Sequence, residues 1–402
     1  MTHVAQRLAC LGAVLVAGVA LPATGVARAA GPPARAVAGA AGSAGAVQGL
    51  LLGVAALSPA STWAVGYRCL PNCASISQQA ITLIRHWNGR TWSTIASPNP
   101  GADWNYLQSV SATSGTDAWA VGEASLRVDA HTEISGTLIE HWNGRTWVKV
   151  PSPSPGISDN ALFGVGAVSA TNAWAVGDYE GGTGAHQALI LHWNGKTWAR
   201  VPAPNASGHA SSLEAVRAVS AVSAWAVGFD VSAIGQEVTM ILHWNGKTWT
   251  RVPSPSPGNT LSGLGGVSVV SAGSAWATGA SCLSACGEAG EVDHTLILRW
   301  NGKAWSTAAR PGRGLLTAVT AATATSAWAA GSYCVSACGL DAEVDHTLIE
   351  HWNGKTWSTA ASPNRGQLTA VSAASATSAW AVDSSGPRPL ILHWNGTTWS
   401  IQ

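Results

Sequence analysis

The sequence has little charge and few of the common aromatic residues. Only 10% of its 402 residues are charged, and 21 Lys and Arg nearly balance 20 Asp and Glu, for a net charge of +1 at pH 7. There are 2 Phe, 2 Met and 4 Tyr, against 22 Trp. A chain this weakly charged lacks the basic surface on which nucleic-acid binding depends. We therefore expect no nucleic-acid partner and a core built on tryptophan.

Long hydrophobic runs are also missing. The longest, residues 8–21, is too short for a comfortable membrane span. It follows Arg7 and precedes the small-residue motif of residues 27–29, which together are typical of a secretion signal. We expect cleavage after Ala29, so that residues 1–29 are a signal peptide and the Ala/Gly/Pro-rich residues 30–45 a linker. The mature protein would then be secreted, with no membrane span.

Cysteine is scarce, and its positions form a pattern. Of the 7 cysteines, Cys10 falls in the predicted signal peptide, and the other six form three C-x-x-x-C pairs. In an exported chain such pairs favour small-ring disulfides, which stiffen their own loops more than the whole protein. A metal site is the alternative, and it is weaker because no matched second pair accompanies each one. The predicted disulfides are Cys69–Cys73, Cys282–Cys286 and Cys334–Cys338.

Tryptophan marks an internal repeat. The stretch HWNGKTW, as at residues 192–198, occurs seven times with small changes, and a second motif, AWAVG, precedes each copy. The two motifs account for all but one of the 22 tryptophans. The chain is therefore one unit of 51–56 residues written seven times.

Each unit predicts four short antiparallel strands. In the third unit these are strand A (162–170, LFGVGAVSA), strand B (173–177, AWAVG), strand C (188–193, ALILHW) and strand D (197–201, TWARV). Asn194-Gly195 between strands C and D predicts a hairpin with a two-residue type I′ turn. Proline-rich connectors then end strand D.

A four-stranded sheet of this kind cannot bury both faces alone, but radial stacking into a closed ring buries them all. A Leu stands twelve residues before every AWAVG tryptophan and a Val nine before it, with mostly Gly, Ala or Ser around them. Small residues suit the crowded axis of a ring. The predicted fold is all-β, a seven-bladed β-propeller of four-stranded antiparallel blades over residues 46–402. Because each unit runs from strand A to strand D, we expect blade 7 to close on blade 1 by packing, without an exchanged strand.

The repeated hairpin also resembles known propeller families. N-G-K-T-W is similar to a shortened Asp-box of the sialidase-like propellers (S-x-D-x-G-x-T-W), and the paired turn and tryptophan resemble kelch and galactose-oxidase-like blades. The motif is one residue short and has Asn for Asp, and the Gly-Gly pairs of kelch repeats are absent. The resemblance therefore implies the fold and not the activities of those families.

Connection lengths separate two rims. The A–B and C–D connections have the same length in all seven units, whereas the B–C tryptophan-to-tryptophan span varies from 14 to 24 residues and the D–A span from 11 to 15. In an antiparallel meander the B–C and D–A connections emerge together, here called the variable rim, and the A–B and C–D connections form the opposite, constant rim. Loops on a rigid scaffold usually carry recognition.

The variable rim also collects distinctive side chains. Sixteen of the 20 acidic residues fall there, together with the aromatics that do not repeat. Rings beside carboxylates suit stacking on sugars with hydrogen bonds to their hydroxyls, and the alternative is that these loops are simply solvated. The predicted ligand-binding residues are Tyr67, Trp104, Tyr106, Tyr179, Phe229, Tyr333, Asp178, Asp230, Asp293 and Asp345.

The constant rim carries a repeated cation after each Asn-Gly, except at Thr397. This ring could grip an anionic envelope polymer, but charge that protects the outer strands from edge-to-edge pairing is the favoured interpretation. The cations are Arg90, Arg145, Lys196, Lys247, Lys303 and Lys355. The His before each strand-C tryptophan, replaced once by Arg299, recurs at one structural position, so we expect packing or hydrogen bonding and not catalysis.

No catalytic signature stands out, and no catalytic residue is predicted. We expect no cofactor; Glu291/Asp293 and Asp341/Glu343/Asp345 offer only a weak calcium site, without EF-hand spacing. We therefore expect an exported, monomeric, non-enzymatic scaffold that binds a glycan or an extracellular protein through the variable rim. The alternative is a polysaccharide hydrolase or lyase whose carboxylates, for instance Asp178, Asp230, Asp293 and Asp345, converge on the central pocket.

Overall fold

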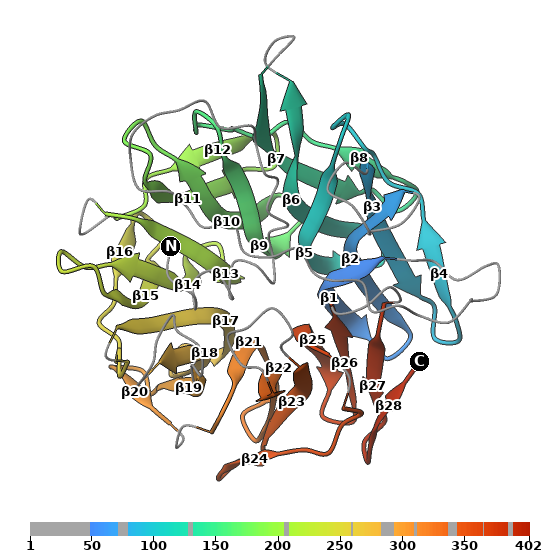
Figure 1. The fold of residues 1–402 in the computed structure, drawn as a ribbon. Coiled ribbons are helices and arrows are strands. Elements are labelled where there is room, and N and C mark those ends of the chain that lie inside the picture. Colours follow the sequence, from blue (N-terminus) through green and yellow to red (C-terminus); the bar gives the residue numbers. More distant parts are fainter. Residues whose placement is uncertain are drawn as a thin grey trace.

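The structure, a computed structural model, describes residues 49–70, 79–127, 132–204, 209–258, 260–282, 293–308, 312–336, 344–364, 366–384 and 389–402. Within these residues 28 strands form seven four-stranded antiparallel sheets, each in the order of the sequence, and the sheets are the blades of a closed wheel (Figure 1). The predicted seven-bladed β-propeller is confirmed. No described residue belongs to a helix that could cross a bilayer. The signal peptide, the linker and residues 46–48 lie outside the described residues, so those boundaries stay predictions.

The first strand of each blade lies nearest the axis and the fourth lies outermost (Figure 1). The strands of blades 1 and 2 are β1 (Leu50–Ser58), β2 (Ser61–Leu70), β3 (Gln79–Trp87), β4 (Trp92–Ile95), β5 (Asn105–Ser114), β6 (Asp117–Arg127), β7 (Glu133–Trp142) and β8 (Trp147–Lys149). Those of blades 3 and 4 are β9 (Asn160–Ser169), β10 (Asn172–Glu180), β11 (His186–Trp193), β12 (Trp198–Val201), β13 (Ser211–Ser220), β14 (Ser223–Val231), β15 (Glu237–Trp244) and β16 (Trp249–Arg251). Those of blades 5, 6 and 7 are β17 (Leu261–Ser271), β18 (Ser274–Cys282), β19 (Asp293–Trp300), β20 (Trp305–Thr307), β21 (Leu315–Thr323), β22 (Ser326–Ser336), β23 (Val344–Trp352), β24 (Trp357–Thr359), β25 (Leu368–Ser375), β26 (Ser378–Asp383), β27 (Ile391–Trp394) and β28 (Trp399–Ile401).

Strand A contains a β-bulge at the same place in every blade. In blade 1, Leu51 pairs with Gly66 and Gly53 with Val65, which leaves Leu52 as the extra residue. A bulge bends its strand and redirects the extra side chain. The seven bulge residues are Leu52, Gln108, Phe163, Glu214, Gly265, Thr317 and Thr369.

The same pairing explains the glycine of AWAVG. A Cβ atom on Gly66 would lie 1.9 Å from the carbonyl oxygen of Leu50. Such a contact is far inside van der Waals distance, so the glycine permits this close approach of strand A to strand B in six blades, whereas blade 7 has Asp383 at this position. The requirement recurs at Gly122, Gly177, Gly228, Gly279 and Gly331, where the clash would be 1.9 to 2.1 Å.

The C–D turn differs from the two-residue type I′ turn that the sequence predicts. In blade 3, Trp193 pairs with Trp198, so four residues form the loop. The Asn194 side chain accepts hydrogen bonds from the backbone N–H groups of Lys196 (2.9 Å) and Thr197 (3.0 Å). Gly195 takes a positive φ of 92°. The prediction was wrong because it ignored this side-chain cap, which offers the backbone an alternative to the shorter turn.

Tryptophans from adjacent blades fill the wedges between the sheets. Trp119 of β6 is 1% exposed and lies 5.0 Å from Trp193 and 5.2 Å from Trp198 of blade 3, measured between ring centroids. The same three-ring contact joins every neighbouring pair of blades, including Trp380 of blade 7 with Trp87 and Trp92 of blade 1. Because each large ring buries much apolar area, these contacts stabilise the wheel at each seam.

The last seam uses the same kind of polar contact as the seam before it. Thr369 Oγ1 of blade 7 donates to the Leu51 carbonyl of blade 1 at 3.0 Å, and Thr317 Oγ1 of blade 6 donates to the Leu368 carbonyl of blade 7 at 2.8 Å. Sheet order is unbroken in blades 1 and 7. The wheel therefore closes by packing without an exchanged strand, as expected.

Candidate functional site

The variable rim is built by D–A loops that lie between two blades. In the loop that joins blades 1 and 2, the Asp103 carbonyl accepts a hydrogen bond from the Ala80 N–H of blade 1 at 2.9 Å. The next carbonyl, of Trp104, accepts from the Ser125 N–H of blade 2 at 2.9 Å. The D–A loops and the ends of the B–C connections therefore share one rim.

The proline-containing connectors are fixed along strand C. Thr82 Oγ1 of β3 lies 2.6 Å from Ser97 Oγ, and the Thr82 N–H donates to Asn99 Oδ1 at 2.7 Å. Thr137, Thr239 and Thr347 make equivalent contacts with the Ser-Pro segments of their own blades. The connectors thus do more than end strand D: they give the rim a rigid base.

The aromatic residues predicted to bind a ligand are mostly buried. Tyr67, Trp104 and Tyr106 are between 5% and 8% exposed and form one cluster, with ring centroids 4.6 Å apart for the tyrosines and 5.4 Å for Trp104 and Tyr106. Burial raises the pKa of both tyrosines. Phe229 is 4% exposed. A sugar could stack on these rings only if the rim opened, so their role in binding stays a prediction.

The other two rings each have a partner within their own blade. Tyr179 is buried, and its hydroxyl donates to Gln187 Oε1 at 2.8 Å while the Arg200 guanidinium lies over its ring. Tyr333 is partly buried, with its hydroxyl 3.3 Å from His346 Nδ1. Both rings lie on strands that reach farther toward the rim than the sequence predicts.

The four predicted aspartates have different surroundings, and a shared role in binding stays a prediction. Asp230 forms an ion pair with Arg251, and Asp345 accepts a hydrogen bond from Gln367. Asp293 is 8% exposed at the start of β19. Asp178 belongs to a larger group of carboxylates.

That group lies in blades 2, 3 and 4. Burial, followed by the charge of Asp159, raises the pKa of Glu123 to about 8, with a smaller effect from Asp178 and opposition from the Ser135 hydroxyl, which donates to its carboxylate at 2.6 Å. His186 lies between two of the acids: its Nδ1 is 3.3 Å from Asp178 Oδ1, and its Nε2 is 3.8 Å from Asp159 Oδ2. The carboxylates of blade 3 therefore influence the ionisation of Glu123 across the seam between blades 2 and 3.

Glu214 extends the group to blade 4, and no sequence motif pointed to it. It is the bulge residue of β13 and is 9% exposed. Burial raises its pKa to about 8, the charges of Asp178 and Glu237 act in the same direction, and the Ser212 hydroxyl opposes them by donating at 2.8 Å. No residue pattern marks a bulge. The available signal is the residue directly after the Leu that all seven repeats share, because its identity differs between the repeats.

The predicted disulfide and calcium positions are only partly described. Cys69, Cys282 and Cys334 lie near the rim ends of β2, β18 and β22, while Cys73, Cys286 and Cys338 lie outside the described residues. The same holds for Glu291, Asp341 and Glu343. Among the described residues, no group of three or more His, Cys, Asp or Glu side chains is arranged to hold a metal ion. The disulfides stay predictions.

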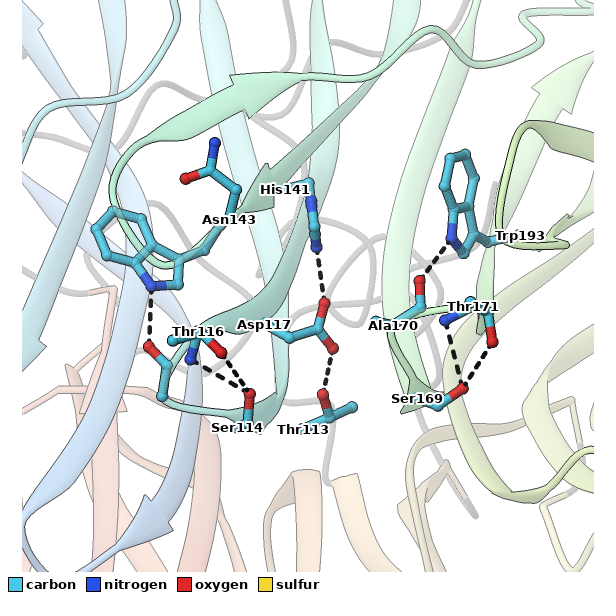
Figure 2. Close-up of polar contacts among 12 residues, drawn as sticks. Thr113, Ser114, Thr116, Asp117, His141, Asn143, Ser169, Ala170, Thr171 and Trp193 are labelled. Carbon is cyan, nitrogen blue, oxygen red and sulfur yellow. Dashed lines mark hydrogen bonds and ion pairs between the residues drawn. The ribbon is translucent and has the colours of Figure 1, made fainter.

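Side-chain hydrogen bonds connect the A–B turns of the constant rim to strand C (Figure 2). The Trp193 indole N–H donates to the Ala170 carbonyl of the A–B turn at 3.0 Å, and all seven strand-C tryptophans make the same bond. In blade 2, Asp117 lies between Thr113 and His141, whose Nε2 is 2.7 Å from Asp117 Oδ1. The recurring histidines pack against the strand-B tryptophans with ring centroids 4.0 to 4.3 Å apart, as expected of packing residues.

Comparison with known proteins supports the fold alone. No protein-family model matches the chain, and no curated protein is detectably similar in sequence. The solved structure described as "Structure of U3-55K" is 9% identical, with a TM-score of 0.50 and coverage of 83% of this chain and 88% of that one. The structure described as "YCF48 bound to D1 peptide" is 16% identical, with a TM-score of 0.46 and coverage of 78% and 84%. The likeness to Asp-box and kelch proteins stays a prediction.

Proposed function

We propose that the chain is an exported, non-enzymatic binding scaffold that recognises a partner through its variable rim. The observation that carries the proposal is the contrast between the rims: one repeats the same two turns, and the other varies in length and side chains on the same rigid base. A fold alone does not establish an activity, and loops on a rigid scaffold usually carry recognition.

The partner we favour is an extracellular protein, and a glycan is the alternative. The rings suited to sugar stacking are mostly buried, whereas aliphatic side chains are exposed at the rim: Leu126 (46%), Ile157 (64%) and Ile234 (78%). Exposed aliphatic groups beside charged ones are common at protein interfaces.

The test compares two triple variants with the wild type. In the first, Leu126, Ile157 and Ile234 are changed to Ser; in the matched control, Val148, Val219 and Val222, which are exposed elsewhere, are changed to Ser. Extracellular proteins that the immobilised wild type captures should be lost by the first variant and kept by the control. Equal capture by all three, or binding only to a glycan array, would count against a protein-binding rim.

A second candidate function, hydrolysis or cleavage of a polysaccharide, is favoured by one observation. Burial, with a smaller contribution from the charge of Asp178, raises the pKa values of Glu123 and Glu214 to about 8. Carboxyl groups with shifted pKa values concentrate at catalytic sites. Their burial works against access by a polymer. Release of reducing ends from a polysaccharide panel, abolished by Glu123→Gln or Glu214→Gln, would establish catalysis; no release by the wild type would reject it.

A further inference from the structure

The constant rim carries positive charge without accessible counter-charge. The six cations that follow the Asn-Gly turns are all exposed, and their side chains make no ion pair or hydrogen bond with any described residue. They are Arg90, Arg145, Lys196, Lys247, Lys303 and Lys355. The positive charge on this rim is therefore available to a partner.

Acidic residues do not neutralise this rim. Sixteen of the 20 belong to the segments of the variable rim. Of the other four, Asp117 is 6% exposed and bonded to His141, Glu140 is fully buried, and Glu214 and Glu350 lie within strands. The molecule is thus nearly neutral overall but polarised along the axis of the wheel, an arrangement that orients a protein in an external field.

The repeat also holds the cations in a fixed ring. The A–B turns contain two residues each, and the second residue packs on the glycine of the C–D loop, as Thr171 packs on Gly195. The capping asparagine holds the backbone of each cation, as Asn194 holds Lys196 at 2.9 Å. Because each cation occupies the same place in its own blade, the six lie around the axis at one level and can meet a flat surface together.

Tryptophan accompanies this ring. The strand-C tryptophan stands directly before each Asn-Gly loop, and six of the seven are only partly buried. Their indole N–H groups are already bonded to the A–B turns. Partly exposed tryptophan beside Lys and Arg is the composition that residues adopt at the boundary between water and lipid.

We propose that the constant rim docks on an anionic lipid bilayer, as a peripheral contact and not a span. A planar ring of cations with flanking indoles fits a planar, negatively charged surface, on which each Lys or Arg contributes favourably. Protection of sheet edges explains the cations less well, because they precede strand D in the loop, and blade 7 has the same outer edge with Thr397 in place of a cation. Docking in this way leaves the variable rim facing the solution.

Binding to lipid vesicles tests the proposal. The wild type is mixed with vesicles of equal parts phosphatidylglycerol and phosphatidylcholine, or of phosphatidylcholine alone, and the bound fraction is measured by co-sedimentation. The test variant changes Lys196, Lys247 and Lys303 to Thr, the residue that blade 7 already carries. The expected loss is about fivefold in partition coefficient for each cation, or roughly 100-fold for the three.

A matched variant removes equal charge elsewhere, with Arg127, Lys149 and Arg313 changed to Thr; all three side chains are exposed. This control variant should bind the anionic vesicles nearly as the wild type does. Added salt should release the wild type and the control variant from the vesicles. Unchanged tryptophan fluorescence and denaturation midpoints confirm that the variants fold.

Four results would overturn the proposal. The wild type could fail to bind anionic vesicles, or the two variants could weaken binding equally, which would show attraction without a dedicated face. Binding of soluble polyphosphate by the six cations without vesicle binding would identify a polymer site instead. Loss of self-association in the test variant alone, measured by sedimentation, would identify a contact between two copies.

Discussion

Glu140 of β7 provides the sharpest test of how the wheel is packed. Its side chain is fully buried, and neither carboxylate oxygen has a hydrogen-bond partner among the described residues. Leu191 occupies the same position in blade 3, in a cluster with Trp119 of the preceding blade. The carboxyl of Glu140 therefore stands where most blades place a leucine against their neighbour, and Glu140→Leu should stabilise the protein.

The magnitude follows from linkage between protonation and folding. Burial raises the pKa of Glu140 from 4.5 to about 8. A carboxyl with a raised pKa in the folded state stays protonated there while the unfolded chain ionises, so its cost is absent below pH 4.5 and grows until the pH passes about 8. The full cost is roughly 5 kcal/mol, of which about 3 kcal/mol is present at pH 7.

The assay is urea unfolding of the wild type and Glu140→Leu at several pH values between 4.5 and 8. The difference between their free energies of unfolding should grow by about 1.4 kcal/mol for each pH unit, because other groups cancel in the comparison. Glu140→Gln, which cannot ionise, should remove the pH dependence without the gain in apolar packing. A constant difference across this range would refute the reasoning and would mean that Glu140 is paired, for instance with Lys149 across the strand pair.

Three further predictions concern the turns and the cysteines. Trp193→Phe removes the indole hydrogen bond to the A–B turn and should lower the free energy of unfolding by about 1 to 2 kcal/mol in urea. Gly195→Ala places a side chain at a φ of 92° and should cost about 1 to 2 kcal/mol, whereas Gly182→Ala, which has open space around it, should be nearly neutral. Peptide mapping of the secreted protein without reductant should recover the bond between Cys69 and Cys73; free thiols would contradict both the pairing and export.

Much of the architecture could be predicted from the sequence because it repeats. Seven copies of AWAVG and HWNGKTW predict seven blades, and the constant and variable connection lengths predict two different rims. Each strand and each connection is predicted from seven copies of the same unit, so an error in one copy would disagree with the other six. The details of single side chains have no such support.

The C–D turn and the aromatic residues of the variable rim differ from what the sequence predicts. Asn-Gly predicted a two-residue turn, yet the Asn194 side chain caps a four-residue loop, an outcome that depends on competing hydrogen bonds of similar strength. Tyr67 and Tyr106 are predicted to bind a ligand, yet they are buried and their rings contact each other across a blade seam. Residues 39 positions apart meet there, and no local pattern reports on such contacts.

The sequence by itself determined the number of blades, the strands in each and the side of the wheel on which every connection emerges, because these depend on periodicity and connection length. Only the tertiary structure decided which side chains meet: it placed Asp178 where its charge acts on both Glu123 and Glu214, and it left the carboxylate of Glu140 without a hydrogen-bond partner among the described residues. The physical reason is that strand A bulges and the blades twist against one another, so the direction of a side chain is set by its neighbouring blade as much as by its own.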